Sequence, residues 1–151
     1  MKKKFIVFSI FLYLLASCED DDFCEEPTTP RLVIAFYDKE NPSTKKKLVV
    51  FAWADQKDSL YKGQFIDSIL LPMNTQSTAT KYKLAATNII ETLDLTYTTS
   101  DLFISEGCGY IAHFNDFGAD LELNANSWID RMEVNVTKIE NETEAHIKIY
   151  H

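Results

Sequence analysis

The chain has 151 residues, of which 46% are hydrophobic, and its 23 acidic and 15 basic side chains give a formal net charge of −8 at pH 7. This acidic balance argues against nucleic-acid binding, which needs a basic surface to offset phosphate charge. The length fits one domain of ordinary size that can bury a core.

The first segment has the layout of an export signal. Lys2, Lys3 and Lys4 precede an uncharged apolar run over residues 5–16, the arrangement typical of a signal peptide. A helix of about twelve residues spans only about 18 Å, short of a hydrocarbon core of roughly 30 Å. We therefore expect residues 1–17 to be a cleaved signal peptide and not a permanent membrane span.

A lipid-attachment motif follows at once. Leu15-Ala16-Ser17-Cys18 resembles the lipobox that lipoprotein signal peptidase recognises: a branched apolar residue, two small residues and a cysteine. The sequence predicts cleavage before Cys18 and lipidation of its thiol, so that the lipid on Cys18 anchors the protein to a membrane. Two or three acyl chains hold a protein firmly, because each buried methylene adds about 0.8 kcal/mol. The alternative is an ordinary secretory signal with a cysteine at its cleavage site.

Residues 18–30 form the next segment, with a run of acids and the prolines Pro27 and Pro30. Such a segment cannot bury enough apolar surface to fold alone, so we expect an acidic tether. An acidic cluster directly behind a lipidated cysteine resembles the surface-export signal of Bacteroidota lipoproteins, although a plain spacer is the alternative. The expected location is the cell envelope, as an outer-membrane lipoprotein that faces the periplasm or is exposed at the cell surface.

Removal of residues 1–17 also changes the charge of the chain. That segment carries three lysines and no acid, so the formal net charge goes from −8 to −11. A body this acidic is not expected to adhere to anionic lipid.

Residues 31–151 are expected to form a single domain made of strands. Apolar and polar residues alternate with period two over 93–98, 132–136 and 145–149, which is typical of half-buried strands. The polar turn 140–144 lies between the last two segments, so these are predicted to pair as a terminal hairpin.

Other runs complete a set of about eight strands: 32–37, 48–53, 69–71, 82–86 and 110–114. Turn signals separate the runs, at Asn41-Pro42-Ser43, Lys62-Gly63, Pro72-Met73-Asn74, Glu106-Gly107 and Phe117-Gly118-Ala119. Short strands at this spacing, with almost no helical periodicity, predict an all-β fold. We expect an antiparallel β-sandwich of Ig-like or Greek-key type, with a barrel as the alternative.

The cysteines divide into an anchor and a pair. With Cys18 assigned to lipid, Cys24 and Cys108 remain, and an even number in an oxidising envelope favours a disulfide. A bridge between them would close a loop of about 85 residues and stabilise the fold by about 4–5 kcal/mol in the chain-entropy model. The alternative is two reduced thiols.

Several motifs of this chain occur together in one group of proteins. They are the lipobox, Cys24 ahead of a Thr-Thr-Pro stretch, Pro30-Arg31-Leu32-Val33-Ile34, Asp67-Ser68-Ile69-Leu70-Leu71-Pro72, Cys108-Gly109 and His146-Ile147-Lys148-Ile149-Tyr150. Together they resemble a family of small Bacteroidota envelope lipoproteins that is known only as a domain of unknown function. The resemblance implies a lineage and an envelope location. It implies no catalytic or binding residue.

Catalytic residues are few. The chain has three histidines, His113, His146 and His151, and no serine lies in a Gly-x-Ser-x-Gly motif. His113 is near Cys108 and Asp116 in sequence, but strand alternation places it on the opposite face from Cys108. We therefore expect His113 to face solvent, and we expect the protein not to be an enzyme and to need no cofactor.

Two further patterns could carry chemistry. Asp116, Asp120 and Glu122 are predicted to share a loop whose oxygens could bind calcium, although their spacing is not that of an EF-hand and a solvated acidic loop is the alternative. No cysteine or histidine spacing suggests zinc.

Asp58-Ser59-Leu60 and Asp67-Ser68-Ile69 resemble the O-glycosylation sites of exported Bacteroidota proteins. Ser59, in an expected polar connection, is the candidate glycan acceptor.

Three hypotheses for the molecular function follow. The first is a non-catalytic, lipid-anchored module that binds another envelope protein, such as an outer-membrane barrel, through a sheet face or edge. The second is a glycan-binding lipoprotein of a nutrient-capture system, for which Trp53, Trp128 and Tyr61 are the candidate aromatic contacts. The third is a hydrolase, which would need a cleft joining His113 to acids and a free hydroxyl.

Overall fold

The regular secondary structure in the described part of the chain consists of strands. The computed structural model describes residues 28–55 and 57–151, and within them it contains ten strands and no helix. In particular, none of these residues forms a helix of the length and hydropathy that crossing a bilayer requires. The strands are β1 (Leu32–Tyr37), β2 (Leu48–Ala54), β3 (Ser59–Ile66), β4 (Ser68–Leu71), β5 (Ala79–Ala86), β6 (Ile89–Ser105), β7 (Gly109–Glu122), β8 (Arg131–Val134), β9 (Lys138–Ile139) and β10 (Ile147–Tyr150).

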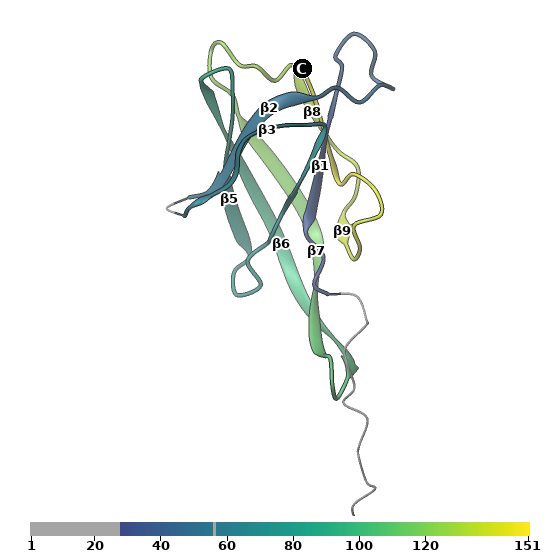
Figure 1. The fold of residues 1–151 in the computed structure, drawn as a ribbon. Helices are drawn as coiled ribbons and strands as arrows, with labels where there is room; N and C mark the ends of the chain where they lie inside the picture. The colour runs from purple at the N-terminus through teal and green to yellow at the C-terminus, as the bar shows by residue number, and fades with distance from the viewer. Residues whose placement is uncertain (1–27, 56) are drawn as a thin grey trace, which may run out of the picture.

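These strands form two sheets. The larger sheet has the order β3-β2-β5-β6-β7-β9, is antiparallel throughout and curves as a half-barrel (Figure 1). The smaller sheet has the order β4-β1-β10-β8 and is mixed, because β1 and β10 run parallel while the other pairs are antiparallel. The first and last described strands are therefore neighbours in space.

A single core cluster joins the two sheets. In the smaller sheet it includes Leu32, Ile34 and Phe36 of β1, and in the larger sheet Val50 and Ala52 of β2. Because side chains alternate across a strand, the residues between these members point away from the core. We call the side of the six-stranded sheet that faces away from this cluster the outer face.

The all-β prediction is confirmed, and each of the eight predicted runs lies in or overlaps a strand. Two details of the prediction are wrong. The described residues contain ten strands and not about eight, and the smaller sheet is not fully antiparallel. The pairing of the two C-terminal runs is confirmed, since β8 pairs antiparallel with β10. They do not form a simple hairpin, because β9 lies between them in sequence and belongs to the other sheet.

Strand β3 was missed because a glycine inside it resembles a turn. The predicted turn at Lys62-Gly63 is instead a bulge: the register between β2 and β3 shifts there, and Gly63 has a φ of 80°. A Cβ atom at this position would lie 2.7 Å from Cζ of Phe51. Glycine therefore supplies both the backbone conformation and the space for the Phe51 ring.

A second predicted turn, at Phe117-Gly118-Ala119, is also wrong. Strand β7 continues through it and pairs with β6, with a register shift opposite Thr96 to Thr98. Asp116, with a φ of 51°, absorbs the irregularity. As a result, both Tyr97 and Phe117 point into the core, where each is buried.

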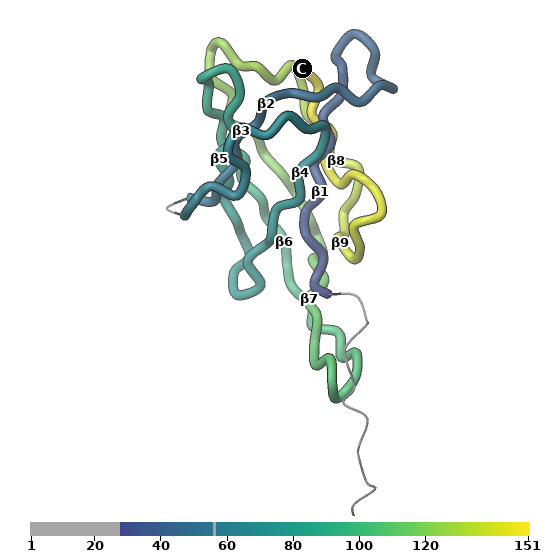
Figure 2. The backbone as a smooth tube through the Cα atoms, in the orientation of Figure 1, coloured from purple at the N-terminus to yellow at the C-terminus, as the bar shows by residue number. Residues whose placement is uncertain are grey.

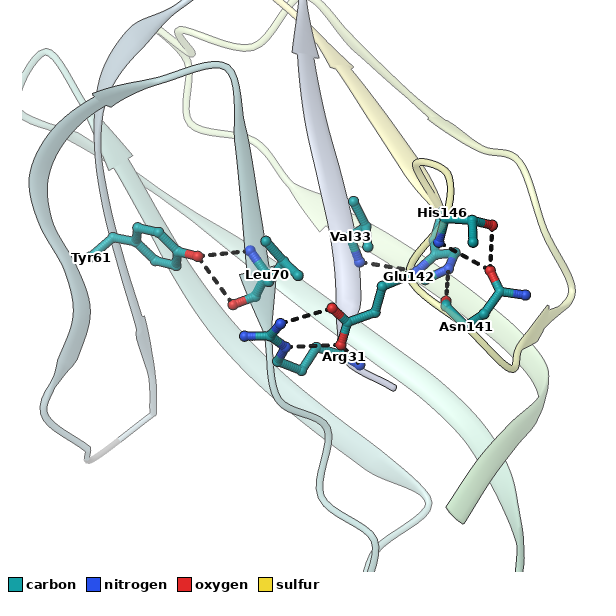
Figure 3. Close-up of polar contacts among 8 residues, drawn as sticks. Arg31, Val33, Tyr61, Leu70, Asn141, Glu142 and His146 are labelled. Atoms are coloured by element: carbon teal, nitrogen blue, oxygen red, sulfur yellow. Dashed lines mark hydrogen bonds and ion pairs between the residues drawn. The ribbon is translucent and has the colours of Figure 1, made fainter. Parts of the chain in front are cut away.

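Polar contacts hold β1 to the loop before β10 (Figure 3). The Arg31 guanidinium donates Nε–H to Oε1 of Glu142 at 2.9 Å and Nη2–H to Oε2 at 2.8 Å, and the Arg31 backbone N–H donates to Oε1 at 2.9 Å. The guanidinium is half exposed, and exposed ion pairs each contribute only about 0.2–1 kcal/mol. The two hydrogen bonds between the guanidinium and the carboxylate therefore fix the position of the loop more than they stabilise the fold.

His146 makes the buried part of the same junction. Its Nδ1 accepts the Val33 N–H at 3.0 Å, and its Nε2 lies 2.9 Å from the Asn141 carbonyl oxygen. The first contact needs a lone pair on Nδ1, so the ring is neutral with its proton on Nε2. Burial lowers the pKa of His146 below its ordinary value of 6.5, although the Asn141 hydrogen bond and the nearby Glu142 and Glu144 oppose this shift.

Prediction on His146. Because the folded protein binds the His146 proton less tightly than the unfolded chain does, the free energy of unfolding should fall as the pH drops below about 6.5 toward 5. Protonation of Nδ1 would also leave the Val33 N–H without its acceptor. Urea unfolding at a series of pH values measures this slope.

The His146→Asn variant should lose the slope in this window. It should also be less stable at pH 7 by about 1–3 kcal/mol, since a buried backbone group is left unpaired. His113→Asn is the control and should retain the slope. A wild-type stability that stays constant between pH 7 and 5 would contradict the prediction.

Candidate functional site

An exposed apolar surface lies where β2 and β3 meet on the outer face. Val49 and Phe65 are register partners, and the two residues are 49% and 66% exposed. Phe51, 42% exposed, lies over Gly63 on the same face. We call Val49, Phe51 and Phe65 the β2–β3 apolar surface. It adjoins an edge, because β3 is the last strand of its sheet.

An apolar groove of about 530 Å³ borders this surface. Val49, Phe51, Trp128 and His151 are among the residues that line it. Trp128 packs against Phe36 and His151, with ring centroids 6.2 and 6.4 Å apart. Its indole Nε1 is buried and has no hydrogen-bond partner among the described residues.

A second hollow, of about 450 Å³, lies further along the outer face and is polar. Trp53 lies on its wall, and Lys83 donates from Nζ to Oγ1 of Thr92 at 2.6 Å. Register partners place these side chains in one row across β2, β5, β6 and β7. The lining is Trp53, Asp55, Lys83, Ile90, Thr92, Glu122, Leu123 and Asn124. We call it the polar hollow.

The three aromatic residues proposed as glycan contacts do not share one face. Trp53 lies on the outer face, whereas Trp128 and Tyr61 pack against the core cluster. The Tyr61 hydroxyl is already engaged, because it accepts the Leu70 N–H at 2.8 Å and donates to the Leu70 carbonyl at 3.3 Å (Figure 3). Only Trp53 keeps the placement that the glycan hypothesis requires.

The acidic loop proposed for calcium is not a loop. Asp116, Asp120 and Glu122 all lie in β7, and Asp116 accepts a hydrogen bond from Oγ1 of Thr98 at 3.1 Å. In residues 28–55 and 57–151, no group of three or more His, Cys, Asp or Glu side chains is arranged to hold a metal ion. The error came from reading Gly118 as a turn residue.

The histidines and the serine that sequence analysis singled out lie in different surroundings. His113 is less exposed than expected, at 16% of its side chain, and its Nδ1 lies 3.7 Å from Oε1 of Glu140. Both ring nitrogens of His146 are engaged by backbone groups. Ser59 is the first residue of β3, opposite Trp53, and not part of a connection. Its role as a glycan acceptor stays a prediction.

Sequence analysis missed one buried carboxylate. Glu91 is fully buried, and its Oε2 accepts the Asn124 backbone N–H at 2.8 Å, while Oε1 has no partner among the described residues. The signal was present, because extending the alternation of Leu93 and Leu95 back by one step places Glu91 on the inward face. The observed contact attaches Asn124 to β6, at the start of the loop that carries Trp128 of the apolar groove.

Cys18 and Cys24 lie outside the described residues, so lipidation and the disulfide stay predictions. The described chain nevertheless begins in contact with β7, the strand that starts directly after Cys108. Oγ1 of Thr29 accepts the Ala112 N–H at 3.0 Å, and Ala112 is four residues from Cys108. Those four residues of strand span about 13 Å, and the five from Cys24 to Thr29 can extend to about 17 Å. The bridge is therefore within the length of the chain.

The described chain is thus an all-β protein of two sheets with a polar hollow on the outer face and an apolar groove that borders the β2–β3 apolar surface. It belongs to a family of unknown function (DUF6452), whose model matches residues 47–151. The predicted membership of a family of unknown function is confirmed. No curated protein and no solved structure matches the chain.

Prediction on the disulfide. The mature chain with Cys18→Ser, purified without reductant, should have a mass lower by two hydrogens than the reduced chain and should resist alkylation. Reduction should destabilise it by about 4–5 kcal/mol, because the loop of about 85 residues is released in the unfolded state. Cys24→Ser is the control, in which one thiol reacts with or without reductant. Two freely alkylated thiols in the oxidised sample would count against the bridge.

Proposed function

We propose that this protein is a lipid-anchored lipoprotein of the cell envelope that binds another envelope protein without catalysing a reaction. The observation that carries the proposal is the β2–β3 apolar surface beside an edge strand. The outer membrane of a Bacteroidota bacterium is the proposed location, supported by the lipobox before Cys18 and the acidic run behind it. We propose an outer-membrane β-barrel protein as one kind of partner.

The exposure of the β2–β3 apolar surface supports a binding role. Single exposed apolar residues are ordinary, but contiguous ones on a sheet face mark interaction sites. Phe65 and Val49 form a cross-strand pair, Phe51 is adjacent, and the apolar groove extends the surface toward Trp128. A partner that covers this surface would remove several large apolar side chains from water together.

The form of the edge suggests how a partner would dock. Within residues 28–55 and 57–151, β3 pairs with β2 alone, so its outward main-chain groups are available to an added strand. The bulge at Gly63 and a second register shift near Leu60 interrupt that edge, and bulges of this kind hinder continuous strand addition. We therefore propose that the partner contacts mainly the face, with the side chains of the β2–β3 apolar surface giving specificity.

Prediction on the partner. Crosslinking in native membranes should recover an envelope protein with the wild-type chain. The Phe65→Asp variant should lower the yield of that protein about tenfold or more, because this is the effect of losing one central interface side chain. The substitution is on an exposed position, so stability should change by only about 0.5 kcal/mol.

Val134→Asp is the matched control for this experiment. It also places a carboxylate on an exposed strand position, but on β8 in the smaller sheet, and should leave the yield unchanged. Recovery of the chain alone, or equal recovery with both variants, would rule out a partner at the β2–β3 apolar surface.

A second candidate function is glycan binding at the polar hollow. An aromatic side chain beside carboxylate, ammonium and amide groups is the kind of lining that holds a small polar ligand in place, and Trp53, Lys83, Glu122 and Asn124 provide it. Ligand binding here needs no contribution from Tyr61 or Trp128.

Prediction on the polar hollow. If the hollow binds glycans, titration calorimetry against a panel of polysaccharides should detect a ligand whose affinity falls about tenfold or more in Trp53→Ala. Phe65→Ala should leave that affinity unchanged, because Phe65 lies outside the hollow. Equal affinities in the two variants would remove the polar hollow from consideration.

A further inference from the structure

The β6–β7 hairpin extends beyond the other strands of its own sheet and beyond the smaller sheet. The pairing of β6 with β5 ends at Thr96, and the pairing of β7 with β9 begins only at Phe114. Among the residues that the structure describes, the strand segments 100–105 and 109–113 of the hairpin thus pair only with each other. Figures 1 and 2 show this end of the hairpin projecting from the body of the molecule.

An aromatic pair lies on the projecting part. Phe103 and Tyr110 are register partners with ring centroids 5.2 Å apart, and they are 53% and 69% exposed. Leu102 is also exposed, on the opposite side of the ribbon. Isolated two-stranded ribbons are only marginally stable in water. An exposed aromatic pair on such a ribbon calls for a surface to cover it.

The start of the described chain lies at the same end of the molecule (Figure 2). Thr29 binds the backbone of Ala112 in the hairpin, and Pro30 is buried beside it. Ten residues lead from Cys18 to Thr28, a length that extends to at most about 35 Å. A lipid on Cys18 would therefore keep the hairpin close to the bilayer.

We propose that the hairpin face bearing Phe103 and Tyr110 rests on the bilayer that holds the Cys18 lipid. The proposal depends on the lipid anchor, which is part of the proposed function. Phenylalanine and tyrosine rings suit the interface between headgroups and hydrocarbon. The tether keeps the hairpin at a high local concentration near the membrane, so a weak contact suffices.

Charge selects the kind of bilayer. Between Lys83 and Arg131 the chain has no lysine or arginine, while Asp101 and Glu106 are exposed on the hairpin. The contact is therefore apolar, and anionic headgroups oppose it. Asp101 lies two residues from Phe103 on the same face, which keeps that face at headgroup depth and out of the hydrocarbon.

Tryptophan quenching by brominated lipid tests the proposal. The lipidated full chain with Tyr110→Trp is reconstituted in vesicles of phosphatidylcholine brominated on its acyl chains, and the emission of the added indole is obtained by subtracting the wild-type chain. Most of that emission should be quenched. Phe65→Trp is the matched control, an exposed aromatic position on the β2–β3 apolar surface, and its added emission should be unaffected.

Two further arms make the test decisive. Replacing part of the lipid with brominated phosphatidylglycerol should reduce the quenching at low salt, and added salt should restore it as the repulsion is screened. Equal quenching of Tyr110→Trp and Phe65→Trp would overturn the proposal. So would a blue shift of the Tyr110→Trp emission that follows protein concentration in detergent, since a second copy would then cover the pair.

The outcomes separate this proposal from the one on which it rests. If the full-length wild-type chain, taken from its native membrane, does not float with vesicles, it lacks the lipid anchor, which refutes the anchored state itself. A chain that floats without quenching at position 110 has the anchor but no hairpin contact. Loss of the partner in Phe65→Asp is scored on the other surface and is independent of both.

Discussion

The parallel pairing of β1 with β10 is the constraint on which the rest of the structure depends. These strands are the two central members of the smaller sheet, in which β4 pairs with β1 and β8 pairs with β10. Leu32, Ile34 and Phe36 of β1 belong to the core cluster that joins the two sheets. The contacts of Arg31 with Glu142 and of Val33 with His146 fasten the same junction. The body closes only when both ends of the described chain meet.

Much of the fold could be predicted because alternation and apolar runs report burial directly. The bounds of β1 were predicted correctly, and β2 and β4 within one residue. The errors arose at glycines, because glycine occurs both in turns and inside strands. Gly63 and Gly118 look like turn residues in sequence, but in the structure one makes a bulge and the other lies within a strand. Only the neighbouring strand decides between a turn and a bulge, and a single sequence does not show which strands are neighbours.

The candidate sites were harder to predict for a related reason. Alternation assigns Val49 and Phe51 to one face of β2, but it does not tell whether another layer covers that face. Phe65, Phe103 and Tyr110 were therefore not singled out, although they are among the most exposed apolar residues described. Conversely, Tyr61 and Trp128 look like free aromatic contacts in sequence, yet both pack against the core. Exposure depends on the arrangement of the two sheets, which pairing at long sequence separation sets.

The absence of lysine and arginine between Lys83 and Arg131 has a consequence for digestion by proteases. Trypsin-like proteases cut only after those two residue types, and exposed, weakly supported backbone is where such enzymes ordinarily cut first. The projecting hairpin is backbone of this kind, but it offers these enzymes no cleavage site along its length. Its composition thus gives it a resistance to digestion that its local stability alone would not provide.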